Sequence, residues 1–321
     1  MQKSSSVNDA PAQRLPMINR VAHDTRVQHN RKPKWGFVKT IVLVAVALYM
    51  VILIVPLFLS FFYSFTDLNP LFPNTKFVGL QNYVDMLSDA DFLSALGRTI
   101  NLSLDVTLTA NVLGLFVAIM LNRPSRFYAI LRTLFFIPQV LSGVIVGFIW
   151  GVILTTNNGI LNIVLKQIGI TAQNIAWLGK PNLAFLALTV VIIWQQMGFC
   201  VVVYLAALQG IPQDLVEAAT IDGANRWNIF SKVTFPLLAP GVTVNVVLLL
   251  IISLKIYDQI VVLTAGGPGG QTETLAYYIV RITFTSNEAG YGSAVALVLF
   301  FLIAIISIIL TSFLRKREVE L

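Results

Sequence analysis

Six runs of apolar residues, each long enough to cross a lipid bilayer, restrict the fold of this chain more than any other feature. A membrane-spanning helix needs about 20 apolar residues, and only helices or closed barrels satisfy their backbone hydrogen bonds in lipid. The runs are continuous, whereas the strands of a barrel are short and alternate in polarity, so helices are predicted. The predicted spans are residues 40–62, 101–121, 134–154, 183–208, 241–263 and 294–314.

The composition supports a protein that is surrounded by lipid. Only 12% of its 321 residues are charged, against roughly a quarter in soluble domains. We therefore predict an all-α membrane protein whose six-span domain covers residues 37–321. Residues 1–36 are rich in Gln, Asn, Ser, Pro and Arg and predict a disordered basic tail. The first run is longer than the apolar region of about 7–15 residues in a signal peptide, so we expect a span there and no cleaved signal.

Lysine and arginine are concentrated on alternate connections between the spans, which predicts the orientation of the chain. By the positive-inside rule, the connections rich in these residues face the cytoplasm. Both termini, and the loop between the fourth and fifth spans, are therefore expected to be cytoplasmic. The basic residues on this side include Arg31, Lys32, Lys34, Lys39, Arg123, Arg126, Arg132, Arg226, Lys232, Arg315, Lys316 and Arg317.

The sequence offers little material for catalysis or metal binding. Its only cysteine, Cys200, lies in an apolar run and is expected to be a buried thiol. Its two histidines lie in the polar tail. A phosphate-binding loop is also missing, because Gly179-Lys180 is followed by Pro181 and preceded by Asn174 where the first glycine of that motif belongs. We expect no catalytic residue, no metal site and no nucleotide site in this chain, and the net charge of +7 is assigned to membrane orientation instead of nucleic-acid binding.

The loop between the fourth and fifth spans is polar and predicts a helix, a glycine and a second helix. Pro212 suits the first turn of a helix, and the carboxylates of Asp214 and Glu217 favour its positive end. Gly223 is expected to end this helix. A second short helix carries an apolar stripe of Trp227, Phe230 and Val233 and is expected to end at Pro236.

Two interpretations of this loop follow from its residues alone. It could be an amphipathic hairpin lying on the lipid headgroups, as its basic residues and Trp227 suggest. It could instead be a surface that contacts another protein, because Asp214, Glu217 and Asp222 disfavour an anionic membrane surface.

The spacing of residues in this loop resembles the EAA loop of ABC importer permeases. Glu217-Ala218-Ala219 is followed after three residues by Gly223, and after nine more by Val233-Thr234-Phe235-Pro236. The family pattern has Ile and Leu where this chain has Val233 and Phe235, and both replacements stay apolar. In that family the loop forms coupling helices that fit a cleft in a separate ATPase subunit. The resemblance therefore implies that the ATPase contact is made by Glu217, Ala218, Ala219, Asp222, Gly223 and Pro236.

Further motifs, in the same order along the chain, resemble the carbohydrate-uptake branch of these permeases. That branch includes importers of glycerol-3-phosphate, lactose and multiple sugars. The resemblance implies a location in the bacterial plasma (inner) membrane. It also implies a second homologous permease, two ATPase subunits that bind ATP and magnesium, and an extracytoplasmic solute-binding protein. The matching stretches are FVGLQNY at 77–83, RTLFFIP at 132–138, AWL at 176–178, LAALQGIP at 205–212, LTAGGP at 263–268 and GYGSA at 290–294.

Polar residues inside the predicted spans are candidates for a translocation path. Lys255 and Asp258 are expected on one face of the fifth span, where they could line the path or form an ion pair between spans. Trp194, Gln195 and Gln196 could hold a sugar through amide groups and an aromatic face, or could join helices by hydrogen bonds. Asp105 and Asn111 are further polar residues in the second span.

We therefore predict a permease subunit of an ATP-driven, binding-protein-dependent importer for a sugar or related polyol, with glycerol-3-phosphate among the candidates. One alternative is an ion-coupled secondary transporter that acts alone, for which broken helices in inverted repeats and an intramembrane acid would be expected. A membrane protein without transport activity is a second alternative, and no motif favours it.

Overall fold

The structure is a computed structural model that describes residues 35–72, 74–171, 173–316 and 318. Most of the predicted tail lies outside these residues, but Trp35 and Gly36 belong to the first turn of helix α1. Within the described ranges the chain is helical, and its one strand-like feature is an isolated bridge between Thr66 and Phe77.

The chain divides into two compact units, residues 1–54 and 55–321. The described part of the first unit consists of α1 (Trp35–Tyr49) and a π-helical turn (Met50–Ile54). The second unit begins with α2 (Val55–Tyr63) and contains all the remaining helices.

Four of the predicted spans are single helical segments in the described chain. They are the segment Lys39–Tyr63, α4 (Ala90–Leu121), α8 (Pro181–Gln209) and α15 (Ala289–Arg315). Helix α4 starts at Ala90, well before residue 101, where the predicted second span begins. The side chain of Asp89 caps this early start by accepting hydrogen bonds from the N–H groups of Asp91 and Phe92.

The other two predicted spans are bent or interrupted, which the sequence analysis did not predict. The third consists of α5 (Arg126–Val140) and α6 (Gly143–Leu154), which meet at 99°. Pro138 removes a backbone hydrogen bond near the end of α5, and the side chain of Ser142 then caps α6 by accepting a hydrogen bond from the N–H of Ile145. By length and composition, the described chain has four candidate spans, or up to six if each bent pair is one span.

The predicted fifth span, residues 241–263, is interrupted once, and a bend lies just before its start. The helical stretch Arg226–Leu237 meets α12 (Ala239–Leu254) at 61°. Residues 255–257 then separate α12 from α13 (Asp258–Leu263).

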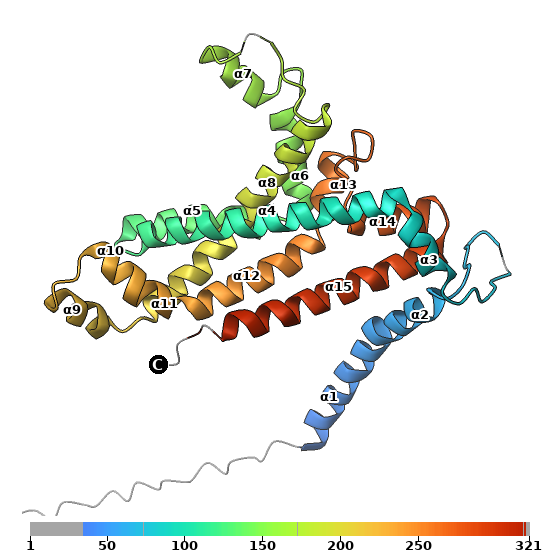
Figure 1. Cartoon of the computed structure of the whole chain (residues 1–321), viewed down its shortest axis with the longest axis horizontal. Helices are drawn as coiled ribbons and strands as arrows, with labels where there is room; N and C mark the ends of the chain where they lie inside the picture. Colours follow the sequence, from blue (N-terminus) through green and yellow to red (C-terminus); the bar gives the residue numbers. More distant parts are fainter. Residues whose placement is uncertain (1–34, 73, 172, 317, 319–321) are drawn as a thin grey trace, which may run out of the picture. The chain divides into compact units, whose positions relative to one another are not determined.

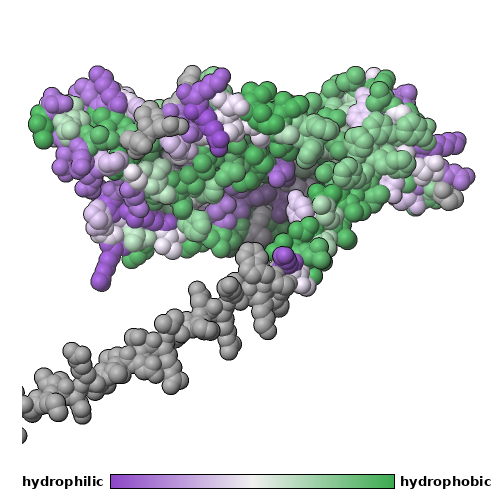
Figure 2. All heavy atoms as spheres, turned by 90° about the horizontal axis from the view of Figure 1, so that it is seen from below, coloured by the Kyte–Doolittle hydropathy of each residue, from purple (hydrophilic) through white to green (hydrophobic). Residues whose placement is uncertain are grey.

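Shorter helices connect these segments (Figure 1). Helices α3 and α14 lie at the end of the second unit where α4 and α15 begin, and α9 and α10 lie at the opposite end. In Figure 2, apolar residues cover much of the visible face, and hydrophilic residues gather at the end that contains α9 and α10. The bounds are α3 (Gln81–Ser88), α7 (Ile160–Gln167), α9 (Gln213–Ile221), α10 (Arg226–Ile229), α11 (Phe235–Leu237) and α14 (Leu275–Val280), with π-helical turns at Phe230–Thr234 and Arg281–Thr285.

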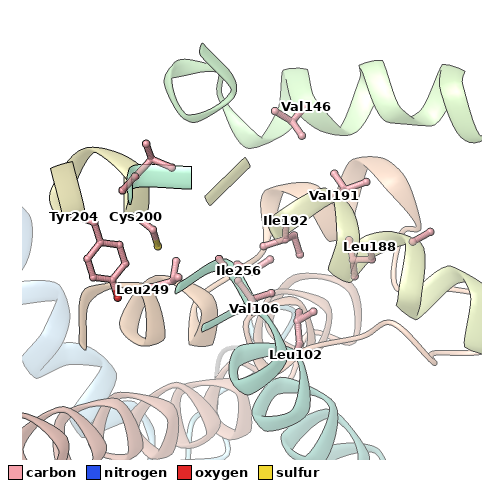
Figure 3. Close-up of a cluster of buried hydrophobic side chains, with 14 of the residues drawn as sticks. Leu102, Val106, Val146, Leu188, Val191, Ile192, Cys200, Tyr204, Leu249 and Ile256 are labelled. Atoms are coloured by element: carbon pink, nitrogen blue, oxygen red, sulfur yellow. The ribbon is translucent and has the colours of Figure 1, made fainter. Parts of the chain in front are cut away.

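Helix α8 contributes many residues to the main apolar core and contacts α4, α5 and α12. Figure 3 shows part of this core. Leu188, Ile192 and Tyr204 of α8 are buried there. The predicted burial of the Cys200 thiol is confirmed. The contact with α4 depends on Gly114, because a Cβ at that position would overlap the Cβ of Cys200.

Candidate functional site

Helix α9 ends in a Schellman motif, as Gly223 predicts. Gly223 has a φ of +79°, a conformation that costs glycine less than other residues. Its N–H donates to the carbonyl of Thr220 at 3.1 Å, and the N–H of Ala224 donates to the carbonyl of Ala219 at 3.0 Å. These two bonds define the motif, so the glycine of the EAA pattern turns the chain sharply out of α9.

The second half of the loop differs from the prediction at its end. Asn225 caps α10 by accepting a hydrogen bond from the N–H of Asn228 at 2.8 Å, a role that the sequence analysis missed although Asn is a preferred N-cap. Pro236 does not end the helix, because it lies within α11 and the bend follows at Leu238. Pro236 instead lies near the end of the helical stretch Arg226–Leu237, two residues after the π-helical turn Phe230–Thr234.

The surface of α9 is accessible along its whole length, since none of its residues is buried. Leu215, Ala218 and Ile221 follow one another at spacings of three residues and share one side. Ile221 is 86% exposed and Leu215 40% exposed, whereas Ala219 is half-buried. The carboxylates of Asp214, Glu217 and Asp222 are also exposed. We call the side formed by Leu215, Ala218 and Ile221, together with Trp227 of α10 at 71% exposure, the α9 surface.

A cleft of about 660 Å³ separates α9 from the turn between α4 and α5. Arg132 holds this turn in place, because its Nε and Nη2 donate to the carbonyl of Leu121 at 3.1 and 2.8 Å and Nη2 also donates to Arg123 O at 3.1 Å. A guanidinium group there satisfies carbonyls at the negative end of α4. The lining residues include Asn122, Arg123, Arg132, Gln209, Gln213, Glu217 and Thr234.

The predicted cluster in the fourth span lies on α8, opposite the break between α5 and α6. Gln195 is 4% exposed, and its Nε2 donates to the carbonyl of Leu141 at 2.9 Å. The rings of Trp194 and Trp150 are 5.5 Å apart, edge to face. Gln196 is buried, and among the described residues its Oε1 has no hydrogen-bond partner.

Gln259 completes this arrangement, and the sequence analysis did not identify it. Its Nε2 donates to Oε1 of Gln195 at 2.7 Å, so Gln195 connects the break at Leu141 with the start of α13. Gly143 allows the start of α6 to lie close to Gln259, since a Cβ at this position would lie 2.9 Å from the amide group of Gln259. We call Leu141, Gln195 and Gln259 the glutamine node.

Lys255 and Asp258 do not lie on one helical face as predicted. Lys255 follows the last residue of α12, and Asp258 is the first residue of α13. Both side chains are exposed in the isolated chain. In the part of the chain that the structure describes, the ion pairs join Arg281 to Glu273 at 2.7 Å and to Asp91 at 3.5 Å, and none joins Lys255 to Asp258.

The two polar residues of the second span have different environments. Asn111 is buried and accepts a hydrogen bond from the Tyr204 hydroxyl at 2.7 Å, so it joins α4 to α8. Asp105 is exposed. Within the described ranges, no group of three or more His, Cys, Asp and Glu residues could hold a metal ion.

Comparisons with known proteins match this architecture. Residues 110–319 match the family described as "Binding-protein-dependent transport system inner membrane component". Among the relatives, the "Probable starch degradation products transport system permease protein AmyD" of Thermoanaerobacterium thermosulfurigenes is 36% identical over 85% of this chain and 91% of its own length. The "Trehalose/maltose transport system permease protein MalF" of Thermococcus litoralis is 33% identical over 90% of this chain and 96% of its own length.

A further relative, the "Multiple sugar-binding transport system permease protein MsmF" of Streptococcus mutans, is 36% identical over 89% of this chain and 97% of its own length. Among solved structures, a chain of a "bacterial ABC transporter involved in the import of the acidic polysaccharide alginate" is similar with a TM-score of 0.76 and 22% identity. That likeness covers 88% of this chain and 96% of the other, and it shows a shared fold.

Proposed function

The chain belongs to the family of binding-protein-dependent transport system inner membrane components, and from this premise we propose that it is the membrane permease subunit of an ATP-driven sugar importer. The observation that most directly supports this proposal is the exposed α9 surface within the EAA pattern. An apolar helix side without buried residues, at a polar end of a membrane protein, fits a contact with another protein. We assign that contact to a separate ATPase subunit.

A sugar is the substrate class that the relatives support best. Three of them carry names that refer to starch degradation products, multiple sugars, and trehalose or maltose. We therefore propose an oligosaccharide ahead of a polyol or glycerol-3-phosphate. The family membership does not favour the alternative of an ion-coupled transporter acting alone.

The proposed cycle converts closure of two ATPase subunits into movement of the spans. One permease is paired with a second homologous permease, and an extracytoplasmic binding protein delivers the sugar. ATP binding draws the α9 surface with the ATPase and shifts the spans from an inward-open to an outward-open state. The ATPase can drive this shift only as far as its affinities for the two states differ.

The energy source is tested by sugar uptake into proteoliposomes that contain the complete complex and its binding protein. We expect accumulation that requires ATP on the side of the ATPase and that persists in the presence of a protonophore. Accumulation that ignores ATP and collapses with the protonophore would support the ion-coupled alternative and contradict the proposal.

The coupling contact is tested by placing a charge on the α9 surface. Ile221→Asp should weaken retention of the ATPase subunit on purification by about tenfold, which corresponds to about 1.4 kcal/mol, because a carboxylate is poorly accommodated in an apolar interface. Ile170→Asp is the matched control, since Ile170 is also highly exposed, at 69%, but lies after α7. Equal retention by both variants and the wild type would remove α9 from the interface.

A further inference from the structure

Helix α3 has three distinct sides, and one of them is an exposed apolar stripe. Asn82 and Met86 are buried against the rest of the second unit, at 8% and 3% exposure. Leu80, Val84 and Leu87 recur at i, i+4 and i+7 and therefore form one stripe along the helix. They are 65%, 57% and 73% exposed. These three residues are called the α3 stripe.

Hydrogen bonds fix α3 at the level where the first apolar helix ends. Asn82 Nδ2 donates to the carbonyls of Ser64 and Thr66 at 2.8 and 2.9 Å. The Tyr83 hydroxyl donates to Ser64 Oγ at 2.8 Å. Since α2 ends at Tyr63, these bonds hold α3 next to the last turn of a segment long and apolar enough to span the membrane.

The third side of α3 is polar and faces an acidic cleft. Gln81 Nε2 donates to Asp85 Oδ1 at 2.7 Å along this side. The cleft has a volume of about 330 Å³ and is lined by Asp67, Asp85, Asp89 and Glu288, with Asn69, Asn82 and Tyr291 among its other residues. Four carboxylates around one cleft require water or ions nearby, so this side of α3 lies in an aqueous environment.

The helix to which α3 is bonded also has exposed apolar residues, since Phe58 and Phe62 of α2 are 68% and 57% exposed. Phe77, which precedes α3, is 73% exposed. A helix with adjacent apolar and polar sides, held at the end of a span, has the character of an interfacial helix. Figure 1 places α3 at the end of the second unit opposite to α9.

From this juxtaposition we propose that the α3 stripe is a lipid-binding surface. It lies between the acyl chains and headgroups of the leaflet on the side away from α9, and the acidic cleft beside it faces water. The stripe and the hydrogen bonds of Asn82 together fix the depth of the corner between α2 and α4 in the bilayer. This inference requires only that the chain spans a membrane and does not depend on the proposed substrate or energy source.

Site-directed spin labelling tests this inference directly. Cys200 is the only cysteine in the sequence, so a Cys200→Ser background allows single cysteines at Leu80, Val84 and Leu87. Gln81→Cys and Asp85→Cys on the polar side of the same helix serve as matched controls. The labelled full-length chain is reconstituted in vesicles of phosphatidylethanolamine and phosphatidylglycerol, and the same positions are measured in membranes that contain all co-expressed subunits.

We expect stripe positions to collide preferentially with oxygen, which concentrates in lipid, and control positions to collide with a water-soluble nickel chelate. The ratio of oxygen to nickel accessibility should be several-fold higher on the stripe in both preparations. High nickel accessibility on the stripe would show that it faces water and would overturn the inference. Immobilised labels shielded from both reagents would show that a protein covers the stripe, which would also overturn it.

Discussion

At the scale of single residues, Gly223 and Asn225 determine the geometry of the turn between α9 and α10. Gly223 ends α9 with a left-handed backbone, and two residues later Asn225 starts α10 with its side-chain carbonyl. The chain therefore turns from α9 into α10 without burying the apolar residues of α9 against α10. This leaves Leu215 and Ile221 available to a partner.

The Gly223→Ala variant should separate the effect of backbone strain on stability from an effect on coupling between the ATPase and the spans. No atom lies within 4 Å of the position of an added Cβ, so the cost comes from the φ of +79° and is expected to be about 1 kcal/mol. Gly169 provides a matched control, with a φ of +77° and equally open surroundings. Thermal unfolding should show similar losses for both alanine variants, whereas only Gly223→Ala should lower ATP-driven uptake. Equal uptake by the two variants would contradict a coupling role for this turn.

Asp89 is a second residue with several simultaneous partners, and it predicts a dependence on pH. Burial alone would raise the pKa of its carboxyl group, but hydrogen bonds from the hydroxyls of Tyr278 and Tyr291 and from the N–H groups of Phe92 and Asp91 hold that pKa below its usual value. A lowered folded-state pKa stabilises the protein above the unfolded-state value of about 3.9, and this stabilisation is lost as the pH falls through the folded-state value.

The Asp89→Asn variant should remove this acid sensitivity while it keeps a good N-cap for α4. We expect lower thermal stability than the wild type at neutral pH and a flatter stability profile below about pH 4. Asp214→Asn, which removes an exposed carboxylate from α9, is the control and should follow the wild type. If Asp89→Asn kept the wild-type profile, another carboxylate would be responsible for the acid transition.

At the scale of helices, the glutamine node connects two broken segments across α8. Helices α5 and α6 separate at Leu141, and α12 and α13 separate at residues 255–257. Gln195 donates to the first break and accepts from the start of α13. A movement at either break therefore strains a hydrogen bond that involves the same α8 side chain.

The Gln259→Leu variant tests this connection. It should leave Oε1 of Gln195 unpaired and cost about 1 kcal/mol of stability, the magnitude of a hydrogen bond between membrane helices. A double-mutant cycle with Gln195→Leu should give a coupling free energy of similar size, measured by thermal unfolding in detergent, and uptake should fall in both single variants. Gln167→Leu at the exposed end of α7 is the control. Additive effects in the cycle would show that the two amides act independently.

The sequence predicts helices and their ends well where neighbouring residues determine them, and poorly where contacts with distant residues determine them. The run at 183–208 corresponds to α8, and the φ of Gly223 follows from a glycine at a helix end. The break at 255–257 contains neither glycine nor proline, and the polar residues Lys255 and Asp258 beside it predict a path or an ion pair instead of a helix end. The partner of Gln195 is 64 residues away on a helix whose existence depends on that break. The coupling role of Glu217 and its neighbours, and a sugar path at Trp194, Gln195, Gln196, Lys255 and Asp258, remain predictions.

At the scale of the whole protein, the positive-inside pattern predicts that residues on the two sides of the membrane differ in accessibility. In a Cys200→Ser background, a cysteine at Ile170 should react with a membrane-impermeant maleimide in intact spheroplasts. A cysteine at Ile221 should react only after permeabilisation, because we propose that α9 and both termini are cytoplasmic. Both native side chains are highly exposed, so access to the reagent decides the result. The reverse labelling pattern would invert the proposed orientation.

The close approach of Gly114 to Cys200 has a consequence for how such a protein can change shape. An α4 backbone that touches an α8 side chain with no room for a methyl group cannot slide without steric overlap. We therefore expect helices α4 and α8 to move together as one pair. In a change between two states, the other helices would then move relative to this pair, and we expect the bends near Leu141 and Leu238 to change their angles.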